Sequence, residues 1–228
     1  GSETFTDSLQ VRLHSVDAQA QLYYSLDGSV PTRFHTKYAG PFWLHKTRRV
    51  RAIAVLADGR RSFPVEATYY QVEAGRNIRL ASTYANQYAA GGDRALMDGL
   101  RGGPNFRTGR WQGFQEDLHA VLDLGKVKAV RRLSMGFLQD IGSWIWLPKE
   151  VEFAISQDGK SWQLAAHLLP EVPDDQDGGL TFDFVKEWPV AQQIRYVRVR
   201  ATNYGQCPDW HLGAGGKTWV FADEILVE

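Results

Sequence analysis

Two segments in the second half of the chain place a tryptophan beside short polar side chains, Trp144 in an irregular stretch after residue 139 and Trp210 in another after residue 206. An indole ring can stack on the C–H face of a pyranose, while carboxylate and imidazole groups hydrogen-bond its hydroxyls. These residue types therefore favour a sugar-binding site built on loops. The candidate sugar-binding residues are Trp144, Asp209, Trp210 and His211, together with Asp140 and Trp111.

The same tryptophans have a second interpretation, because protein cores usually bury this residue. Trp162, Trp188 and Trp219 lie in strand-like runs, where packing is the expected role. Trp210 could likewise close the end of a core while Pro208 shapes a tight loop. Both roles remain open for Trp210 at the level of sequence.

Charged and thiol groups give little support for catalysis. Asp223 and Glu224 are adjacent in a strand-like run, so their side chains point to opposite faces and cannot flank one bond unless a bulge intervenes. Cys207 is the single cysteine, which excludes an internal disulfide, and no histidine pair has the spacing of a zinc site. The loop at 213–218 lacks the first glycine of a phosphate-binding loop.

The charge balance also excludes several classes of partner. The 26 Lys and Arg residues equal the 26 Asp and Glu residues, which disfavours a general nucleic-acid binder. No apolar run approaches the roughly 20 residues that span a bilayer. A local basic cluster remains, with Arg48, Arg49 and Arg51 opposite Arg60 and Arg61 across a predicted hairpin. It is either a solvated sheet face or a polyanion-binding surface.

The elements that must position these residues are strands. Short runs alternate apolar and polar residues, for example at 9–14, 151–155 and 197–201, which is typical of strands with one buried face. Asp-Gly pairs at 27–28 and 58–59 predict hairpin turns, as does a third pair at 158–159. One short helical stretch is expected at 93–97, and the fold class is otherwise all-β.

The chain is expected to form two domains. A complete strand pattern ends at Val72, and a new one starts at Ile78, so we divide the chain into residues 1–74 and 75–228. The first has the size of a small β-sandwich and the second that of a larger one.

The second domain carries motifs that resemble the discoidin, or coagulation factor five/eight type C, family, which includes the family 32 carbohydrate-binding modules. The resemblance runs from about Asn77 to the C-terminus and implies a jelly-roll β-sandwich. Its motifs are ALMDG at 95–99, Trp111, VLDLG at 121–125, VEFAISQDGKSW at 151–162, RYVRV at 195–199 and ADEI at 222–225.

The first domain resembles the small β domain that follows the catalytic barrel of chitobiases and β-N-acetylhexosaminidases, which implies an immunoglobulin- or fibronectin-like β-sandwich. The residues that carry this resemblance are YYSLDGSVPT at 23–32 and YAGPF at 38–42. The two domains together are similar to the C-terminal region of bacterial β-N-acetylhexosaminidases.

This resemblance implies a non-catalytic accessory region of a secreted, periplasmic or cell-surface bacterial glycoside hydrolase. A catalytic barrel of about 250 residues does not fit here beside two β domains. The implied partners are the protein's own catalytic domain and a glycan ending in a galactose- or N-acetylhexosamine-type sugar. Two alternatives are a structural appendage that braces the barrel and an adhesion module for polyanions or anionic membranes.

The resemblance further implies a structural Ca²⁺ near the early Asp-Gly turn and the final Glu. Asp98 and Glu224 occupy those positions. The family's usual Thr is displaced by a longer stretch at 100–107, so Thr108 is a candidate third ligand. The alternative is that a charged residue caps a turn.

Overall fold

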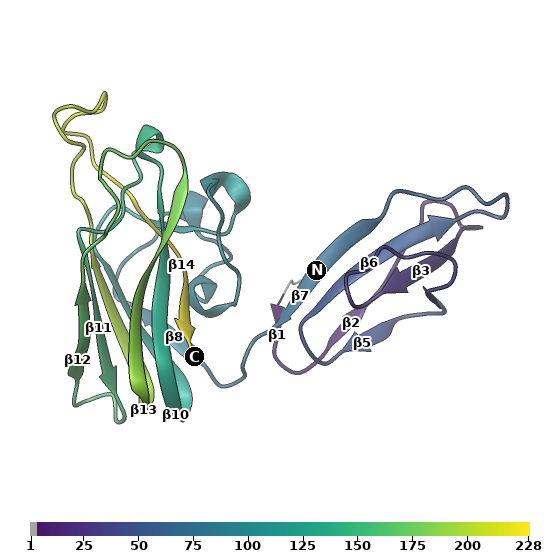
Figure 1. The fold of residues 1–228 in the computed structure, drawn as a ribbon, viewed down its shortest axis with the longest axis horizontal. Coiled ribbons are helices and arrows are strands. Elements are labelled where there is room, and N and C mark those ends of the chain that lie inside the picture. Colours follow the sequence, from purple (N-terminus) through teal and green to yellow (C-terminus); the bar gives the residue numbers. More distant parts are fainter. Residues whose placement is uncertain (1–3) are drawn as a thin grey trace. The chain divides into compact units, whose positions relative to one another are not determined.

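The computed structural model describes residues 4–228, which form strands and loops almost throughout (Figure 1). Helix is limited in this part of the chain to four 3-10 turns of three residues each. The predicted all-β class is therefore confirmed. Two compact units divide the chain, Gly1–Ala74 and Gly75–Glu228. We refer to them as the N-terminal unit and the C-terminal unit.

The N-terminal unit is a sandwich of two sheets. Five strands have the order β1-β7-β6-β3-β4, and β2 pairs antiparallel with β5 in a separate sheet. Phe5 and Val50 from the larger sheet share one buried core with Val11 and Leu44 from the smaller sheet, so the two sheets face each other. The strands are β1 (Thr4–Phe5), β2 (Leu9–Val11), β3 (Gln21–Ser25), β4 (Thr36–Lys37), β5 (Phe42–Leu44), β6 (Arg48–Val55) and β7 (Val65–Gln71).

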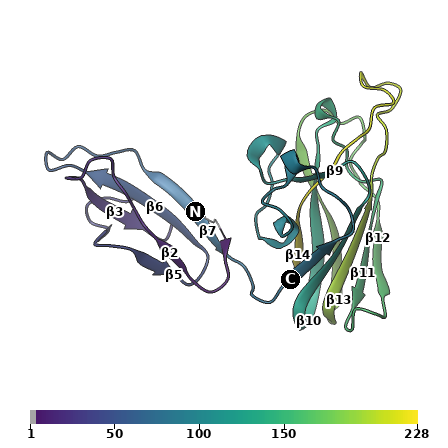
Figure 2. The same ribbon diagram turned by 180° about the vertical axis from the view of Figure 1, so that it is seen from behind.

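The C-terminal unit contains seven further strands and the four 3-10 turns. Two strands, β10 and β13, are much longer than the others (Figure 2). The turn η2 packs against β14. The strands are β8 (Asn77–Leu80), β9 (Gln112–Phe114), β10 (Leu118–Gln139), β11 (Glu150–Ser156), β12 (Gln163–Leu168), β13 (Leu180–Thr202) and β14 (Val220–Val227). The turns are η1 (Asn86–Tyr88), η2 (Ala95–Met97), η3 (Phe106–Thr108) and η4 (Ile141–Ser143).

Each long strand contributes to two layers. Residues 118–123 of β10 pair with residues 196–201 of β13, and residues 120–123 also pair with β8. Strands β11 and β12 extend this layer. Residues 132–139 of β10 pair with residues 180–187 of β13 and with β14, and β9 extends the second layer. The two layers arise because one antiparallel pair of strands is bent in the middle.

The bend coincides with an irregularity between Asp123 and Lys128. Gly125 lies there with φ of 79°, and a Cβ on it would lie 2.6 Å from the carbonyl oxygen of Gly75, so only glycine fits. Leu122 from one layer and Phe137 from the other are fully buried in the same core. The C-terminal unit is therefore a two-layer β-sandwich.

The Asp-Gly pairs lie at turns, with φ of 83° at Gly28, 86° at Gly59 and 72° at Gly159. The pairs at 58–59 and 158–159 lie between consecutive antiparallel strands, as predicted. The pair at 27–28 also lies between consecutive antiparallel strands, β3 and β4, in a connection of ten residues. The predicted helical stretch at 93–97 contains only the three-residue turn η2.

Candidate functional site

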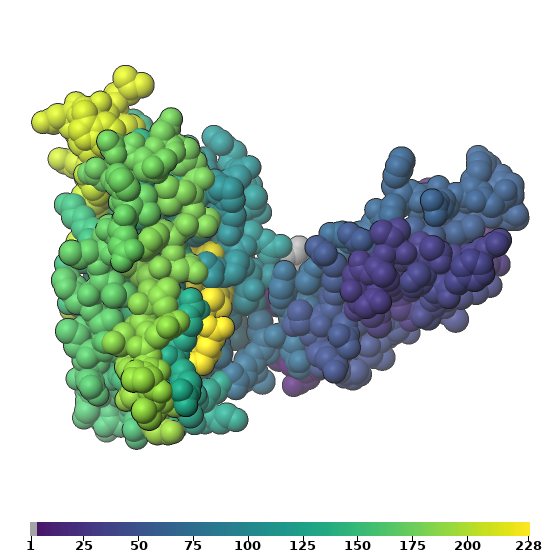
Figure 3. All heavy atoms as spheres, in the orientation of Figure 1, coloured from purple at the N-terminus to yellow at the C-terminus, as the bar shows by residue number. Residues whose placement is uncertain are grey.

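Two loops of the C-terminal unit meet at one end of its sandwich, the β10–β11 loop (residues 140–149) and the β13–β14 loop (residues 203–219). The Trp219 amide donates to the Trp144 carbonyl at 2.8 Å, and the Trp146 amide donates to the Trp219 carbonyl at 3.1 Å. The second loop protrudes as the yellow-green segment at the top of Figure 3. We call these two segments the end loops. They bring Trp144 and Trp210, which are far apart in the sequence, into one region.

Trp144 has an unusual backbone and a flat support. It ends η4 with φ of 63°, a left-handed conformation that costs free energy in a residue other than glycine. Cβ atoms on Gly213 and Gly216 would lie 2.6 Å and 2.7 Å from atoms of its indole ring. The ring therefore lies against glycine backbone, and 41% of the residue remains exposed. A ring held in this way presents a fixed surface to solvent.

His211 joins the two end loops. Its Nδ1 accepts a hydrogen bond from the Gly213 amide at 3.0 Å, so the ring proton lies on Nε2, which donates to the Ile141 carbonyl at 3.1 Å. The sequence suggested that His211 hydrogen-bonds sugar hydroxyls. Instead, both ring nitrogens are engaged with backbone, which makes His211 a positioning residue for the loops.

Trp210 is an exposed residue of the second end loop. It is 54% exposed, and its ring contacts the His211 ring edge to face with centroids 5.9 Å apart. The alternative in which Trp210 closes the core is therefore wrong. Trp146 has that role, because it is fully buried and its Nε1 donates to the Asp174 carbonyl at 2.9 Å.

The remaining predicted sugar-site residues divide between surface and core. Asp209 is exposed beside Trp210. Asp140 is half-buried, and its backbone exchanges hydrogen bonds with Ile145 that close the first end loop. Trp111 is 1% exposed and donates to the Gly103 carbonyl at 2.9 Å, so its ring is not available to a ligand.

The predicted calcium residues lie beside a bulge in β14. Ile225 pairs with Met135 and Ala222 pairs with Phe137, so Asp223 and Glu224 both stand opposite Gly136. This bulge removes the alternation expected of a regular strand. Both carboxylates are buried, and both accept hydrogen bonds from the segment at 99–102.

The hydrogen-bonding capacity of the Asp223 carboxylate is used by groups of the protein itself. Its carboxylate accepts hydrogen bonds from Arg101 Nε at 2.7 Å and from the Gly102 and Glu224 amides at 2.8 Å and 2.6 Å. Arg101 also pairs with Asp183 at 2.5 Å. A Cβ on Gly136 would lie 2.3 Å from the Asp223 carboxylate, so a glycine is needed there. Burial raises the pKa of Asp223, although Arg101 opposes the shift.

Glu224 has fewer compensating contacts. Its carboxylate accepts a hydrogen bond from the Gly99 amide at 2.9 Å, and burial together with the charges of Asp98 and Asp223 raises its pKa to about 8. The buried Glu224 carboxylate and the half-buried Asp98 carboxylate repel each other, and two such carboxylates are a donor set suited to a divalent cation. The positive charge of Arg76 lowers the pKa of Glu224 and would compete with such a cation.

The third calcium candidate does not fit this set. Thr108 is exposed on η3, and its hydroxyl donates to the Asn105 carbonyl at 3.2 Å. Within residues 4–228, no group of three His, Cys, Asp or Glu side chains is arranged to hold a metal. Any calcium held by Asp98 and Glu224 would therefore need backbone, amide or water oxygens as further ligands. The calcium site stays a prediction.

Comparison with known proteins links the N-terminal unit to a defined family. The family model for the chitobiase/beta-hexosaminidase C-terminal domain matches residues 1–66. The matched segment thus ends within the N-terminal unit. A search of curated proteins found no match to the chain.

Solved structures similar to this chain include carbohydrate-binding modules from Clostridium perfringens. The family 32 module of NanJ, in complex with galactose, has a TM-score of 0.44 and 13% identity over 68% of this chain and 93% of its own. The module CpGH89CBM32-5, in complex with GalNAc-beta-1,3-galactose, has a TM-score of 0.43 and 15% identity over 67% and 94%. At such identities, the ligands of those proteins do not indicate which residues of this chain bind.

Proposed function

We propose that this chain is a non-catalytic, carbohydrate-binding accessory region of a larger glycoside hydrolase, with its sugar site on the end loops. The observation that carries the proposal is the pair of exposed indoles, Trp144 and Trp210, on two loops tied together by backbone hydrogen bonds and by His211. Loops held rigidly by a sandwich are common positions for binding sites.

The chemistry of the end loops suits a sugar. The Trp144 ring offers an apolar face for pyranose C–H groups, and its support on glycine backbone means that little side-chain entropy is lost on binding. Asp209 and Asp140 provide carboxylate oxygens for hydroxyls in the same segments. Such a small site on one terminal sugar is expected to bind with a Kd of about 1 mM, or about 4 kcal/mol.

The proposed context is a bacterial enzyme acting outside the cytoplasm. The family match of residues 1–66 supports an origin next to a chitobiase- or β-N-acetylhexosaminidase-type catalytic domain, which would be the intramolecular partner. A terminal galactose- or N-acetylhexosamine-type sugar is the proposed ligand. No helix in the described part of the chain has the length and apolar character needed to span a membrane.

The experiment is a glycan array with this chain, followed by titration of the best neutral sugar into three variants. Trp144→Ala and Trp210→Ala should each weaken binding at least tenfold, about 1.4 kcal/mol, with an unchanged Tm. Trp43→Ala is the matched control, because Trp43 is 56% exposed but lies on β5 of the N-terminal unit.

Two results would contradict the proposal. Absence of binding to any glycan would leave a structural appendage as the better interpretation. Equal loss of binding in the Trp43→Ala variant would place the sugar elsewhere. The polyanion alternative has less support for Arg49, Arg51 and Arg60 of the basic cluster, because Arg49 and Arg51 pair with Glu66 and Arg60 pairs with Asp58.

A further inference from the structure

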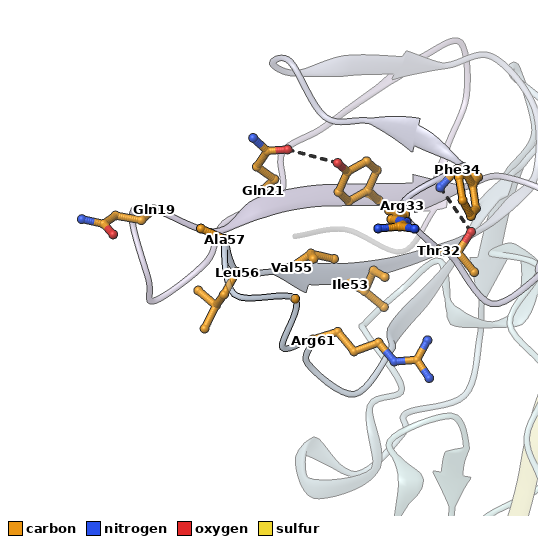
Figure 4. Close-up of a pocket in the computed structure, with 12 residues that line it drawn as sticks. Gln19, Gln21, Thr32, Arg33, Phe34, Ile53, Val55, Leu56, Ala57 and Arg61 are labelled. Atoms are coloured by element: carbon orange, nitrogen blue, oxygen red, sulfur yellow. Dashed lines mark hydrogen bonds between the residues drawn. The ribbon is translucent and has the colours of Figure 1, made fainter.

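The N-terminal unit has a cleft on the outer face of its larger sheet. In β3, Tyr24 stacks on Phe42 of the smaller sheet with ring centroids 4.3 Å apart, so the neighbouring residue Tyr23 points to the opposite, outer face. Tyr23 pairs with Ile53 of β6 across the strands. A cleft of about 650 Å³ lies over this face, bordered by the β3–β4 and β6–β7 connections (Figure 4).

The floor of the cleft is apolar and partly aromatic. Ile53 is 3% exposed although it lies on the outer face, because the flanking connections cover it. Tyr23 and Val55 border it on the same face. Phe34 stands at the margin with 85% of its surface exposed. An exposed phenylalanine at the mouth of a cleft of this size is typical of a binding site for a small molecule.

Two guanidinium groups give the cleft its charge. Arg33 and Arg61 both line it, and Figure 4 shows them on opposite sides of Ile53. The Arg33 guanidinium lies over the Phe34 ring at 5.1 Å, which limits the positions that it samples. No Asp or Glu is among the lining residues. Two guanidiniums in a cleft without an acidic residue favour an anion with paired oxygens, such as a carboxylate or a sulfate.

Neutral polar groups complete the lining. The Gln19 and Gln21 amides and the Thr32 hydroxyl lie around the same cleft. The Gln21 Oε1 accepts a hydrogen bond from the Tyr23 hydroxyl at 3.0 Å, which leaves the amide nitrogen of Gln21 available as a donor. Amides and hydroxyls beside an aromatic ring match a ligand that has both hydroxyls and a C–H face.

We propose that this cleft binds an acidic saccharide residue, with Arg33 and Arg61 on its carboxylate or sulfate and the Tyr23–Phe34 side on its ring. This site is separate from the end loops and does not depend on the function proposed for them. It would allow one chain to contact a neutral terminal sugar and an acidic sugar through different units.

The test uses the whole chain and three defined probes. Trigalacturonic acid supplies the carboxylate, its carboxyl-reduced form is the neutral counterpart, and a sulfated galactose disaccharide supplies the sulfate. Isothermal titration should detect binding of at least one acidic probe and at least tenfold weaker binding of the neutral one. Raising the salt concentration should weaken the acidic interaction, because screening acts on the charge pairing.

Variants assign the binding to the cleft. Arg33→Gln and Arg61→Gln should each weaken binding of the acidic probe about tenfold. Arg60→Gln should leave it unchanged, because this variant loses the same charge one residue away, from a side chain that pairs with Asp58 and does not line the cleft. Trp144→Ala should also leave it unchanged, which separates this site from the end loops.

Three results would overturn the proposal. The first is no binding of either acidic probe at 10 mM. The second is equal binding of the neutral probe, and the third is equal weakening by Arg60→Gln. Concentration-dependent dimerisation that Phe34→Ala abolishes, without saccharide binding, would instead assign the cleft to a second copy of this chain.

Discussion

Two regions of the C-terminal unit hold their candidate residues in opposite ways. In the end loops, backbone hydrogen bonds and glycines fix the chain, and the rings of Trp144 and Trp210 are left exposed. At the β14 bulge, the side chains of Asp223 and Glu224 are buried and themselves fix the backbone of a neighbouring segment.

This difference separates binding from stability. An exposed ring on a rigid support contributes little to folding, so its removal should affect ligands first. A buried carboxylate that accepts backbone amides is part of the fold, and its removal leaves donors unsatisfied. Substitutions in the two regions should therefore have effects on different measurements.

The largest effect is expected at the bulge. Asp223→Ala would remove the acceptor of the Arg101 Nε and of two backbone amides, so the free energy of unfolding should fall by about 3 kcal/mol. Chemical denaturation monitored by fluorescence measures this change. Asp183→Ala is the control, because Asp183 binds the same arginine from a more exposed position and should cost about 1 kcal/mol or less. Equal losses in the two variants would refute the special role of Asp223.

The general architecture could be predicted from the sequence because burial alternates along strands. Residues 151–155 and 197–201 alternate in type and lie in β11 and β13 of the observed sandwich. The Asp-Gly turns followed from the positive φ that glycine tolerates. The bulge in β14 could not be predicted, since ADEI at 222–225 also fits a regular strand and only the partner strand reveals the extra residue.

Which residues of the end loops are exposed was harder to predict, because the left-handed backbone at Trp144 breaks the alternation of faces along a strand. Trp144 and Trp146 are two residues apart and would share a face in a strand. The left-handed backbone at Trp144 instead leaves one ring exposed and the other fully buried. The role of His211 depended on the distant Ile141 carbonyl, which no local sequence signal identifies.

A second prediction concerns calcium binding at Glu224, whose carboxylate accepts fewer hydrogen bonds than that of Asp223. Ca²⁺ bound by Asp98 and Glu224 at about 100 times its Kd should stabilise the fold by about 2.7 kcal/mol, because only the folded state holds both carboxylates together. Differential scanning calorimetry with Ca²⁺ and with a chelator measures the shift. The Glu224→Gln variant should lose the response to calcium. An unchanged Tm and no metal in elemental analysis would exclude this site.

A third prediction tests whether sugar binding depends on the hydrogen bonds that His211 makes to the backbone of the end loops. His211→Ala removes one hydrogen bond between the two end loops and one within the second end loop, so stability should fall by about 1 kcal/mol while sugar binding weakens more than the stability loss explains. Titration and thermal unfolding on the same variant measure the two effects. Leu212→Ala is the control, because Leu212 is fully exposed and should change neither. Unchanged binding in His211→Ala would show that the rings do not need this support.

The smallest effect is expected at a surface turn where a side chain also fixes backbone. Asp158 accepts amides of Lys160 and Ser161 at 2.8 Å each, and these bonds, with the Ser156 hydroxyl, lower its pKa to about 2. Because the folded-state pKa lies below the ordinary value of 3.8, the charged form stabilises the fold above about pH 4, and this contribution is lost as the pH falls towards 2.

Asp158→Asn keeps an oxygen acceptor for the turn but cannot titrate. Wild type should therefore unfold at a slightly higher temperature than this variant between pH 5 and 7, and the two should converge as the pH approaches 2. Thermal unfolding of both proteins across this range measures the difference, in which other acidic groups cancel. A difference that stays constant with pH would mean that the amides of Lys160 and Ser161 do not favour the charged carboxylate. Stabilisation of the backbone by a charged carboxylate would then be limited to the buried residues of the β14 bulge.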